Sequence, residues 1–167
     1  VAWPPIIMSK ADPMQIVGRL ISEVEEYRPD AVFIDDTGGY GSGVIARLRE
    51  LGHNAIGVNF GAKPDDPRYK NKRTEMWMRM RDWIKAGGAI PDILDLKNDL
   101  VSPTYRIPST GIVELESKEK IKERLGRSPD VADALALTFA YFVKAQKRDL
   151  LGRPIAPRVQ VEYDPLG

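Results

Sequence analysis

Carboxylates at two distant places in the chain are the side chains best suited to chemistry in this sequence. Asp35 and Asp36 end an apolar run, and Asp130 and Asp133 lie one helical turn apart in the segment Ser-Pro-Asp-Val-Ala-Asp. A carboxylate at the end of a buried strand is unfavourable unless a cation or hydrogen bonds compensate its charge. Carboxylate oxygens are the ligands that Mg²⁺ and Mn²⁺ prefer. The pattern is therefore consistent with two carboxylate groups that share a divalent cation.

The composition narrows the chemistry further. The chain has no cysteine and one histidine, His53, so disulfides, thiolate nucleophiles, Cys-ligated zinc and His-rich metal sites are excluded. With 167 residues, 43% hydrophobic and 29% charged, the sequence is typical of one globular domain with a real core. No apolar run approaches the ~20 residues of a membrane span, and residues 1–10 lack the pattern of a signal peptide. We therefore expect no membrane association.

Four glycines within residues 38–43 raise a competing interpretation, a phosphate-binding turn. A dinucleotide fingerprint requires glycines at the first, third and sixth places of the turn. Counted from Gly39 the sixth place is Val44, and counted from Gly41 it is Ala46. The next strand ends in Asn59 instead of an acid, and no Gly-Lys-Ser/Thr phosphate loop is present. A Rossmann-like nucleotide-binding protein is thus the less favoured alternative, and glycines here also let the backbone approach a bulky ligand such as nucleic acid.

The elements that must position these residues follow from periodicity and capping signals. We expect helices starting at Asp12–Pro13 and stopped by Pro29, and over Gly43–Leu51, Asn71–Ala86, Ile93–Leu100, Ser117–Leu125 and Ser128–Ala145. Strands are expected over residues 31–35, where both faces are buried, and over Ala55–Phe60, with a hairpin formed by Thr104–Ile107 and Gly111–Glu116. Val1–Met8 reads as an extended segment at a strand edge, and Asp130 as a candidate helix N-cap. Strand, helix and strand at this spacing predict a parallel βαβ unit in an α/β fold.

Basic residues are concentrated between Arg68 and Lys85, a segment that contains seven basic and two acidic residues. Such a stripe on a nearly neutral chain is typical of a surface that contacts a polyanion, but an ordinary solvated helix face has the same composition. Charge alone leaves both interpretations open.

Three ordered segments together resemble a known family. They are PDAVFIDDTGGYGSGVIARLRELG, VNFGAKPDDPRYKNKRTEMWMRMRDWI and LESKEKIKERLGRSPDVADALALTFA. In this order they resemble the C-terminal nuclease domain of phage and prophage terminase large subunits, over about Trp3 to Ala145. The resemblance implies a ribonuclease H-like α/β fold, a mixed sheet flanked by helices. It also implies a metal-dependent endonuclease that cuts concatemeric double-stranded viral DNA with two Mg²⁺ or Mn²⁺ ions.

Carried over by position, the resemblance assigns catalytic and metal-binding roles to Asp35, Asp130 and Asp133. The family's remaining acid lies on a first strand upstream of the segment that matches VAWPP. We therefore expect residues 1–145 to be a nuclease domain truncated at its N-terminus, weakly active or inactive alone, and residues 146–167 to be a tail or linker. The family's ATPase motor has no counterpart in this sequence.

The resemblance also implies partners. Lys118 matches a recurrent Ser-Lys-Glu element, and we expect it to contact DNA phosphates together with Lys72, Arg73 and Arg79. The partners would be double-stranded DNA, the terminase ATPase domain, the small terminase subunit and the portal, in the host cytoplasm during phage assembly. Trp77 is expected in the core, and Glu75 has no evident role. An alternative is a non-catalytic remnant of a terminase that binds DNA or docks on the motor.

Overall fold

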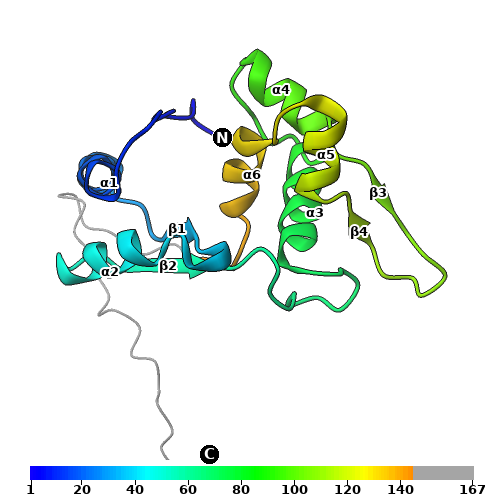
Figure 1. The fold of residues 1–167 in the computed structure, drawn as a ribbon, viewed down its shortest axis with the longest axis horizontal. Coiled ribbons are helices and arrows are strands. Elements are labelled where there is room, and N and C mark those ends of the chain that lie inside the picture. Colours follow the sequence, from blue (N-terminus) through cyan, green and yellow to red (C-terminus); the bar gives the residue numbers. More distant parts are fainter. Residues whose placement is uncertain (145–167) are drawn as a thin grey trace, which may run out of the picture.

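The computed structural model describes residues 1–144 (Figure 1). In chain order its elements are α1 (Pro13–Tyr27), β1 (Val32–Asp35), the short 3₁₀ helix η1 (Thr37–Gly39), α2 (Ser42–Glu50), β2 (Ala55–Val58), α3 (Lys72–Lys85), α4 (Leu94–Val101), β3 (Tyr105–Arg106), β4 (Glu114–Leu115), α5 (Lys118–Leu125) and α6 (Asp130–Leu137). None of the helices in this part of the chain has the length and apolar character needed to cross a membrane. The expected tail, residues 146–167, lies outside the described residues.

The predicted βαβ unit is confirmed. Strands β1 and β2 pair in parallel, with Val32 opposite Ala55 and Asp35 opposite Val58, and α2 connects them. Parallel pairing brings the carboxyl ends of both strands to the same edge of the sheet, so Asp35 and the loop after β2 lie together. All four residues of β1 are only half-buried, which differs from the expectation of a strand covered on both faces.

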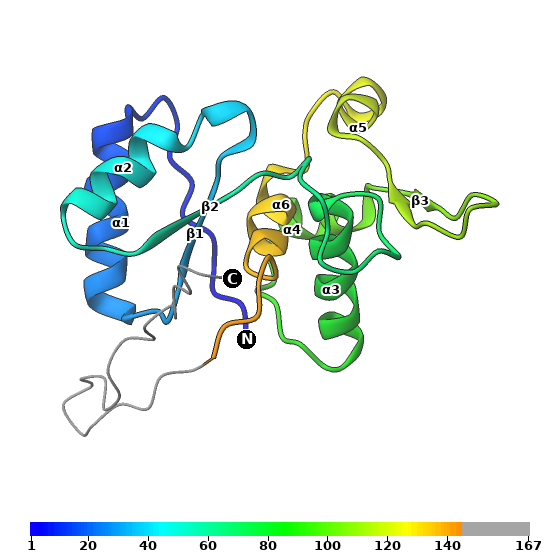
Figure 2. The same ribbon diagram turned by 90° about the horizontal axis from the view of Figure 1, so that it is seen from below.

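Two apolar clusters lie on opposite faces of this sheet. One joins α1, α2 and Ala55; the other joins α3, α4, α6 and Val58. Ala55 and Val58 are three residues apart, and alternation along a strand sends their side chains to opposite faces. Figure 2 shows the same order, with α1 and α2 on one side of β1 and β2 and with α6 and α3 on the other. Strand β2 therefore connects the two halves of the molecule.

The second half is built around the contact between α3 and α6. Helix α4 also packs on α6, and β4 lies against α3. The hairpin of β3 and β4 pairs Tyr105 with Leu115 and Arg106 with Glu114, and it projects away from the helices (Figure 1). The hairpin thus brings the start of α5 back to the first turn of α3.

Helix starts follow the local sequence signals. Asp12 caps α1 in a reciprocal capping box with Gln15, and Pro13 occupies the first helical position. Asn71 caps α3 through the amide of Thr74, and Ser117 caps α5. These caps need only neighbouring residues, which explains why the sequence predicts them well.

The last helix is shorter than predicted. A helix over Ser128–Ala145 was expected, but α6 ends at Leu137, and Ala145 lies outside the described residues. After Leu137 the backbone bonds tighten to three-residue spacing, as in Thr138 to Leu135. Arg79 Nη1 donates to the carbonyls of Phe139 and Ala140 at 3.3 and 3.2 Å. These carbonyls are satisfied by α3 instead of by a further helical turn.

The N-terminal segment Val1–Met8 does not form the expected edge strand. The amide of Ala2 donates to the carbonyl of Ala89 at 2.8 Å, and no strand is assigned to residues 1–8. Pro4 and Pro5 carry no amide hydrogen, so whichever of them faced a neighbouring strand could not donate a ladder bond. The segment instead lies over α6 and Trp83, where it lines an apolar cavity of about 480 Å³.

Candidate functional site

The start of α6 is held by a carboxylate from another helix. Asp99, in α4, is 1% exposed, and its Oδ2 accepts from the amides of Val131 at 3.0 Å and Ala132 at 3.4 Å. Its Oδ1 pairs with Arg127 at 2.6 Å. A carboxylate at free helix amides is the favourable charge for that end of the helix. The N-cap position is Pro129, so the expectation that Asp130 caps its own helix is wrong, because Asp99 supplies this function.

Asp133 is buried, 3% exposed, and one of its oxygens is held by α3. Its Oδ1 accepts from Arg73 Nε at 2.9 Å and from Trp77 Nε1 at 2.6 Å. Arg73 is itself anchored, because its Nη1 donates to the carbonyl of Glu116 at 2.8 Å. Two donors one helical turn apart on α3 therefore fix one side of this carboxylate.

The other oxygen of Asp133 is held much less firmly. Oδ2 lies 3.0 Å from Lys118 Nζ, but it accepts no hydrogen bond of acceptable geometry. The same ammonium group lies 3.7 Å from Asp130 Oδ1. The side chain of Asp130 is 77% exposed and that of Lys118 is 32% exposed. A cation of the chain thus sits between the two carboxylates of α6 and opens toward solvent.

Asp35 is connected to Lys118 only indirectly, through Thr37 and Phe60. Its Oδ1 accepts from the amide of Thr37 at 2.9 Å and from its hydroxyl at 2.5 Å. The hydroxyl oxygen of Thr37 accepts from the amide of Phe60 at 3.0 Å, and Lys118 Nζ lies 5.2 Å from the centre of the Phe60 ring. Asp35 and the carboxylates of α6 therefore flank Phe60 and Lys118 without touching.

The donor set fits a hard divalent cation in type but is incomplete in number. Carboxylate oxygens suit Mg²⁺ and Mn²⁺, and the buried Oδ2 of Asp133 lacks a proper hydrogen bond, which a cation would compensate. Within residues 1–144, however, no three His, Cys, Asp or Glu side chains are grouped closely enough to hold a metal ion. Asp130 and Asp133 meet at Lys118, and Asp35 stands apart. A complete ligand set requires these carboxylates to converge.

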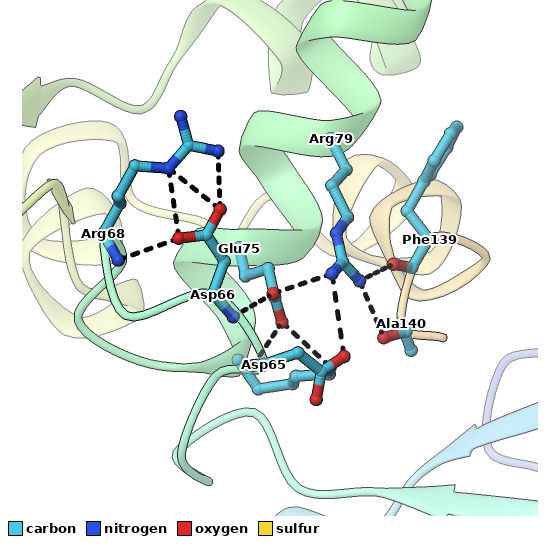
Figure 3. A network of polar contacts seen from close by, with 8 residues as sticks. Asp65, Asp66, Arg68, Glu75, Arg79, Phe139 and Ala140 are labelled. Carbon is cyan, nitrogen blue, oxygen red and sulfur yellow. Dashed lines mark hydrogen bonds and ion pairs between the residues drawn. The ribbon is translucent and has the colours of Figure 1, made fainter. Parts of the chain in front are cut away.

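A further buried carboxylate, which sequence reasoning did not identify, belongs to Glu75 of α3, about half a helical turn from the face of Arg73 and Trp77. Figure 3 shows its contacts. Glu75 is 0% exposed and accepts from the amides of Asp65 and Asp66, from Lys72 Nζ at 2.9 Å and from Arg79 Nη2 at 2.8 Å. We call Asp65, Lys72, Glu75 and Arg79 the Glu75 cluster. A signal was present in the sequence, because positions 72, 75 and 79 share one helix face at spacings of three and four.

The Glu75 cluster changes the interpretation of the basic stripe. The side chain of Lys72 is 2% exposed, paired with Asp65 at 2.8 Å and with Glu75, and its Nζ lies 4.3 Å from the ring centre of Tyr141. Arg79 is partly buried, and Arg73 is held by Asp133. These three side chains are bonded within the chain, so the stripe is not a free solvated face. Their phosphate contacts stay predictions, and of the four candidates Arg79, 35% exposed, and Lys118, 32% exposed, are the accessible ones.

The glycine turn after β1 has an internal reason. A Cβ on Gly41 would lie 2.4 Å from the carbonyl oxygen of Asp35 and 3.0 Å from Ile34 Cγ2. Gly38 and Gly39 adopt φ of 68° and 81°, the left-handed region that favours glycine. At Gly41 the space that glycine leaves is therefore filled by the protein's own strand, which differs from the expectation that it admits nucleic acid.

Hydrogen bonds keep several carboxylates around the site charged. The backbone amide of Glu119 and the hydroxyl of Ser117 lower the pKa of Glu119, with smaller contributions from Arg73 and Lys118. The hydrogen bond from Arg124 lowers the pKa of Glu116, whose carbonyl anchors Arg73. Of the two, Glu119 is the one whose negative charge acts on Lys118 and Arg73.

Comparison with known proteins gives similarity in structure. No family model matches the sequence, and no curated protein matches it. The nuclease domain of the large terminase subunit gp2 of bacterial virus Sf6 is similar with a TM-score of 0.61 and 20% identity, over 77% of this chain and 72% of that one. A point mutant of that domain with manganese gives 0.60 and 20% over 75% and 72%, and one with calcium gives 0.60 and 20% over 75% and 71%.

The similarity spans about three quarters of both chains. The expected ribonuclease H-like α/β architecture is therefore confirmed at the level of the fold. Residues 1–144 have the fold of the nuclease domain of a phage large terminase subunit.

Proposed function

We propose that this chain is a metal-dependent endonuclease domain of a viral DNA-packaging terminase and cleaves concatemeric double-stranded DNA. The observation that carries the proposal is the buried Oδ2 of Asp133, which lacks a hydrogen bond and shares the ammonium group of Lys118 with a second carboxylate, that of Asp130. The similar solved structures are nuclease domains, and two of them contain manganese or calcium. The fold likeness supports this reaction class over a nucleotide-binding protein.

Asp35, Asp130 and Asp133 would hold the Mg²⁺ or Mn²⁺ ions. When bound, such ions supply an activated water and stabilise the leaving oxygen of a phosphodiester. Asp133 stays oriented through Arg73, and Asp99 holds the helix start that carries Asp130. Asp35 lies at the end of β1, at the edge of the sheet where both parallel strands end.

Lys118 would contact the DNA backbone next to these carboxylates. Its ammonium group lies within 4 Å of Asp130 and Asp133, and it can turn toward a phosphate because its side chain is one third exposed. Phosphate contacts of this kind position DNA without reading its sequence. This suits a packaging enzyme that must act on any sequence, alongside the ATPase domain, the small subunit and the portal.

One observation favours a second candidate, a terminase-like module that binds DNA or docks on the motor without catalysis. Residues 1–144 contain no grouped set of three potential metal ligands, and a lysine lies between two of the proposed ones. Such a module would bind DNA with strong salt dependence and would not require a metal ion.

Titration calorimetry separates these candidates. Mn²⁺ should bind the chain in the millimolar range, and binding should be lost in Asp35→Asn, Asp130→Asn and Asp133→Asn. The matched control is Asp82→Asn, because Asp82 is 58% exposed and pairs only with its neighbour Arg81. Salt-sensitive DNA binding without metal binding supports the module, and binding of a dinucleotide supports the Rossmann-like alternative.

Nicking of a supercoiled plasmid tests the reaction itself. Nicking should require Mn²⁺ or Mg²⁺, stop when EDTA is added, and be absent in Asp35→Asn. Nicking that is equal in the wild type, Asp35→Asn and Asp133→Asn would rule out the proposed site. The wild-type rate also measures the activity of the 167-residue chain alone.

A further inference from the structure

We propose that Arg73 and Trp77 are positioning residues that hold Oδ1 of Asp133 and thereby direct its Oδ2 toward the cation. The inference rests on the proposed function, since it names what prepares that metal ligand. Its basis is a group of three side chains from α3 and α6, in contact at 2.9 Å and 2.6 Å. Neither residue would be a ligand of the metal.

Both donors converge on the same oxygen. The two oxygens of a carboxylate are equivalent, so donors do not select one of them, but they can fix the plane of the group. Arg73 Nε and Trp77 Nε1 each donate to Oδ1, so a partial rotation would break two buried hydrogen bonds at once. The plane in which one oxygen meets α3 and the other faces Lys118 is therefore strongly preferred.

The donors themselves are rigid. Arg73 is 7% exposed and is fixed at its far end by the carbonyl of Glu116. The indole of Trp77 is 6% exposed and belongs to the apolar cluster around Met76 and Met80. A ligand held by packed neighbours keeps its geometry before the metal arrives, which favours binding.

The ion pair of Arg73 and Asp133 contains two buried polar atoms that have no hydrogen bond. Among the described residues, the buried side-chain nitrogen and oxygen atoms without a hydrogen bond are Arg73 Nη2 and Asp133 Oδ2. Buried polar atoms are nearly always satisfied, and an exception calls for a physical reason. Oδ2 of Asp133 has the ion pair with Lys118 at 3.0 Å but no hydrogen bond, so it is the less firmly held oxygen of the carboxylate.

The three tryptophans of the chain allow a test that does not depend on activity. Each gives one indole N–H signal in a ¹⁵N-labelled protein, and tryptophan-to-phenylalanine variants assign Trp3, Trp77 and Trp83. Trp83 lies six residues after Trp77 on α3, about 9 Å along the helix. If Mn²⁺ binds at Asp133, it should broaden the Trp77 signal at lower metal concentration than the signals of Trp3 and Trp83.

Two variants then test positioning. Trp77→Phe removes the donor and keeps a ring, and Arg73→Lys keeps the charge but loses the planar guanidinium. Both should bind Mn²⁺ about 10-fold more weakly or worse, as measured by calorimetry. The matched controls Trp83→Phe and Arg81→Lys, on the same helix, should bind Mn²⁺ like the wild type. An unchanged Trp83 signal in Trp77→Phe and in Arg73→Lys shows that α3 is still folded.

The outcomes separate this inference from the proposed function. If the wild type binds Mn²⁺ and both variants bind it with the affinity of their controls, the positioning roles are overturned while the metal site stands. If the wild type binds no Mn²⁺ and no signal broadens, the proposed metal site and the positioning roles both fail. Weaker binding in the two variants, with an intact fold, supports the inference.

Discussion

Glu75 and Asp133 are two buried carboxylates on opposite sides of the first turns of α3, and they are satisfied differently. Glu75 uses both oxygens, which together accept from two backbone amides, a lysine and an arginine (Figure 3). Asp133 uses one oxygen fully, for Arg73 and Trp77, and leaves the other with a single ammonium contact.

The difference separates a structural carboxylate from one available for a ligand. Both carboxylate oxygens of Glu75 already accept hydrogen bonds from the chain. The role of Glu75 is therefore to hold the loop before α3 against the helix. Asp133 is equally buried, yet its Oδ2 lies beside exposed Asp130. Burial alone would rank the two residues together, whereas the donors at each oxygen distinguish them.

The largest expected effect is the loss of stability in Glu75→Gln. Each oxygen of Glu75 faces donors, so an amide nitrogen at either position would meet an N–H group or a cation. The buried ammonium group of Lys72 would also lose one of its two carboxylate partners and keep only the half-exposed Asp65. We expect a loss of about 3–5 kcal/mol in the free energy of unfolding. Asp133→Asn can keep its oxygen toward Arg73 and Trp77, and should lose only about 1 kcal/mol.

Urea unfolding followed by circular dichroism measures both variants, and Mn²⁺ calorimetry completes the comparison. Asp133→Asn should lose metal binding while staying folded. Glu75→Gln should bind Mn²⁺ under conditions where it is folded. Equal losses of stability in the two variants would remove the distinction between the carboxylates.

A second expected effect concerns the third proposed ligand, Asp35. Gly41→Ala would place a methyl group 2.4 Å from the Asp35 carbonyl oxygen, and we expect a loss of about 1–3 kcal/mol together with weaker Mn²⁺ binding. Gly43→Ala is the control, since no atom lies within 4 Å of its new methyl group and α2 should gain up to about 1 kcal/mol. Thermal unfolding compares them, and similar melting temperatures would contradict the close approach at Gly41.

A smaller effect is expected at the start of α6. Asp99→Ala removes the cap from the amides of Val131 and Ala132, and we expect a loss of about 1–2 kcal/mol in urea unfolding. Arg127→Ala removes only the exposed partner of Asp99 and should lose about 1 kcal/mol or less. If Asp99→Ala retained wild-type stability and Mn²⁺ affinity, Asp99 would not be what holds α6.

The smallest effect is a dependence of stability on acid pH at the edge of the Glu75 cluster. The hydrogen bond from Lys72 lowers the pKa of Asp65, with further lowering by Arg79. A lowered pKa in the folded state gives stability that is complete above the ordinary carboxyl pKa of about 4 and is lost as pH falls below it. Asp65→Asn should therefore flatten this acid loss slightly, because the Asp65 side chain is 54% exposed. Melting curves between pH 6 and about pH 3 measure it, and an identical slope in both proteins contradicts it.

The sequence predicted what depends on neighbours along the chain. Asp12 and Pro13 predict the start of α1, and alternating strand and helix patterns predict the parallel pairing of β1 with β2. The ordered motifs also predicted the fold that the solved structures confirm. Asp35 and the carboxylates of α6 were predicted as ligands, and their convergence stays a prediction.

What the sequence did not predict depends on contacts between distant residues. Asp99 caps a helix that begins more than 30 residues later, and Arg73 meets Asp133 across 60 residues. Arg79 contributes to the early end of α6, because it donates hydrogen bonds to the carbonyls of Phe139 and Ala140, which a longer helix would use itself. Periodicity carries no information about such pairs. The sequence therefore indicated a basic stripe, whereas in the structure the cations of α3 belong to the Glu75 cluster or, in the case of Arg73, pair with Asp133.

In the proposed metal site, Asp133, and not Glu75, faces a metal ion. Crystals of the chain soaked in MnCl₂ and measured by anomalous diffraction test it directly. We predict an anomalous peak within coordination distance of Asp133 Oδ2, with Lys118 displaced and with Asp130 or Asp35 as a further ligand. No peak at Asp133 at saturating Mn²⁺, or a peak at the Glu75 cluster in its place, would contradict the account.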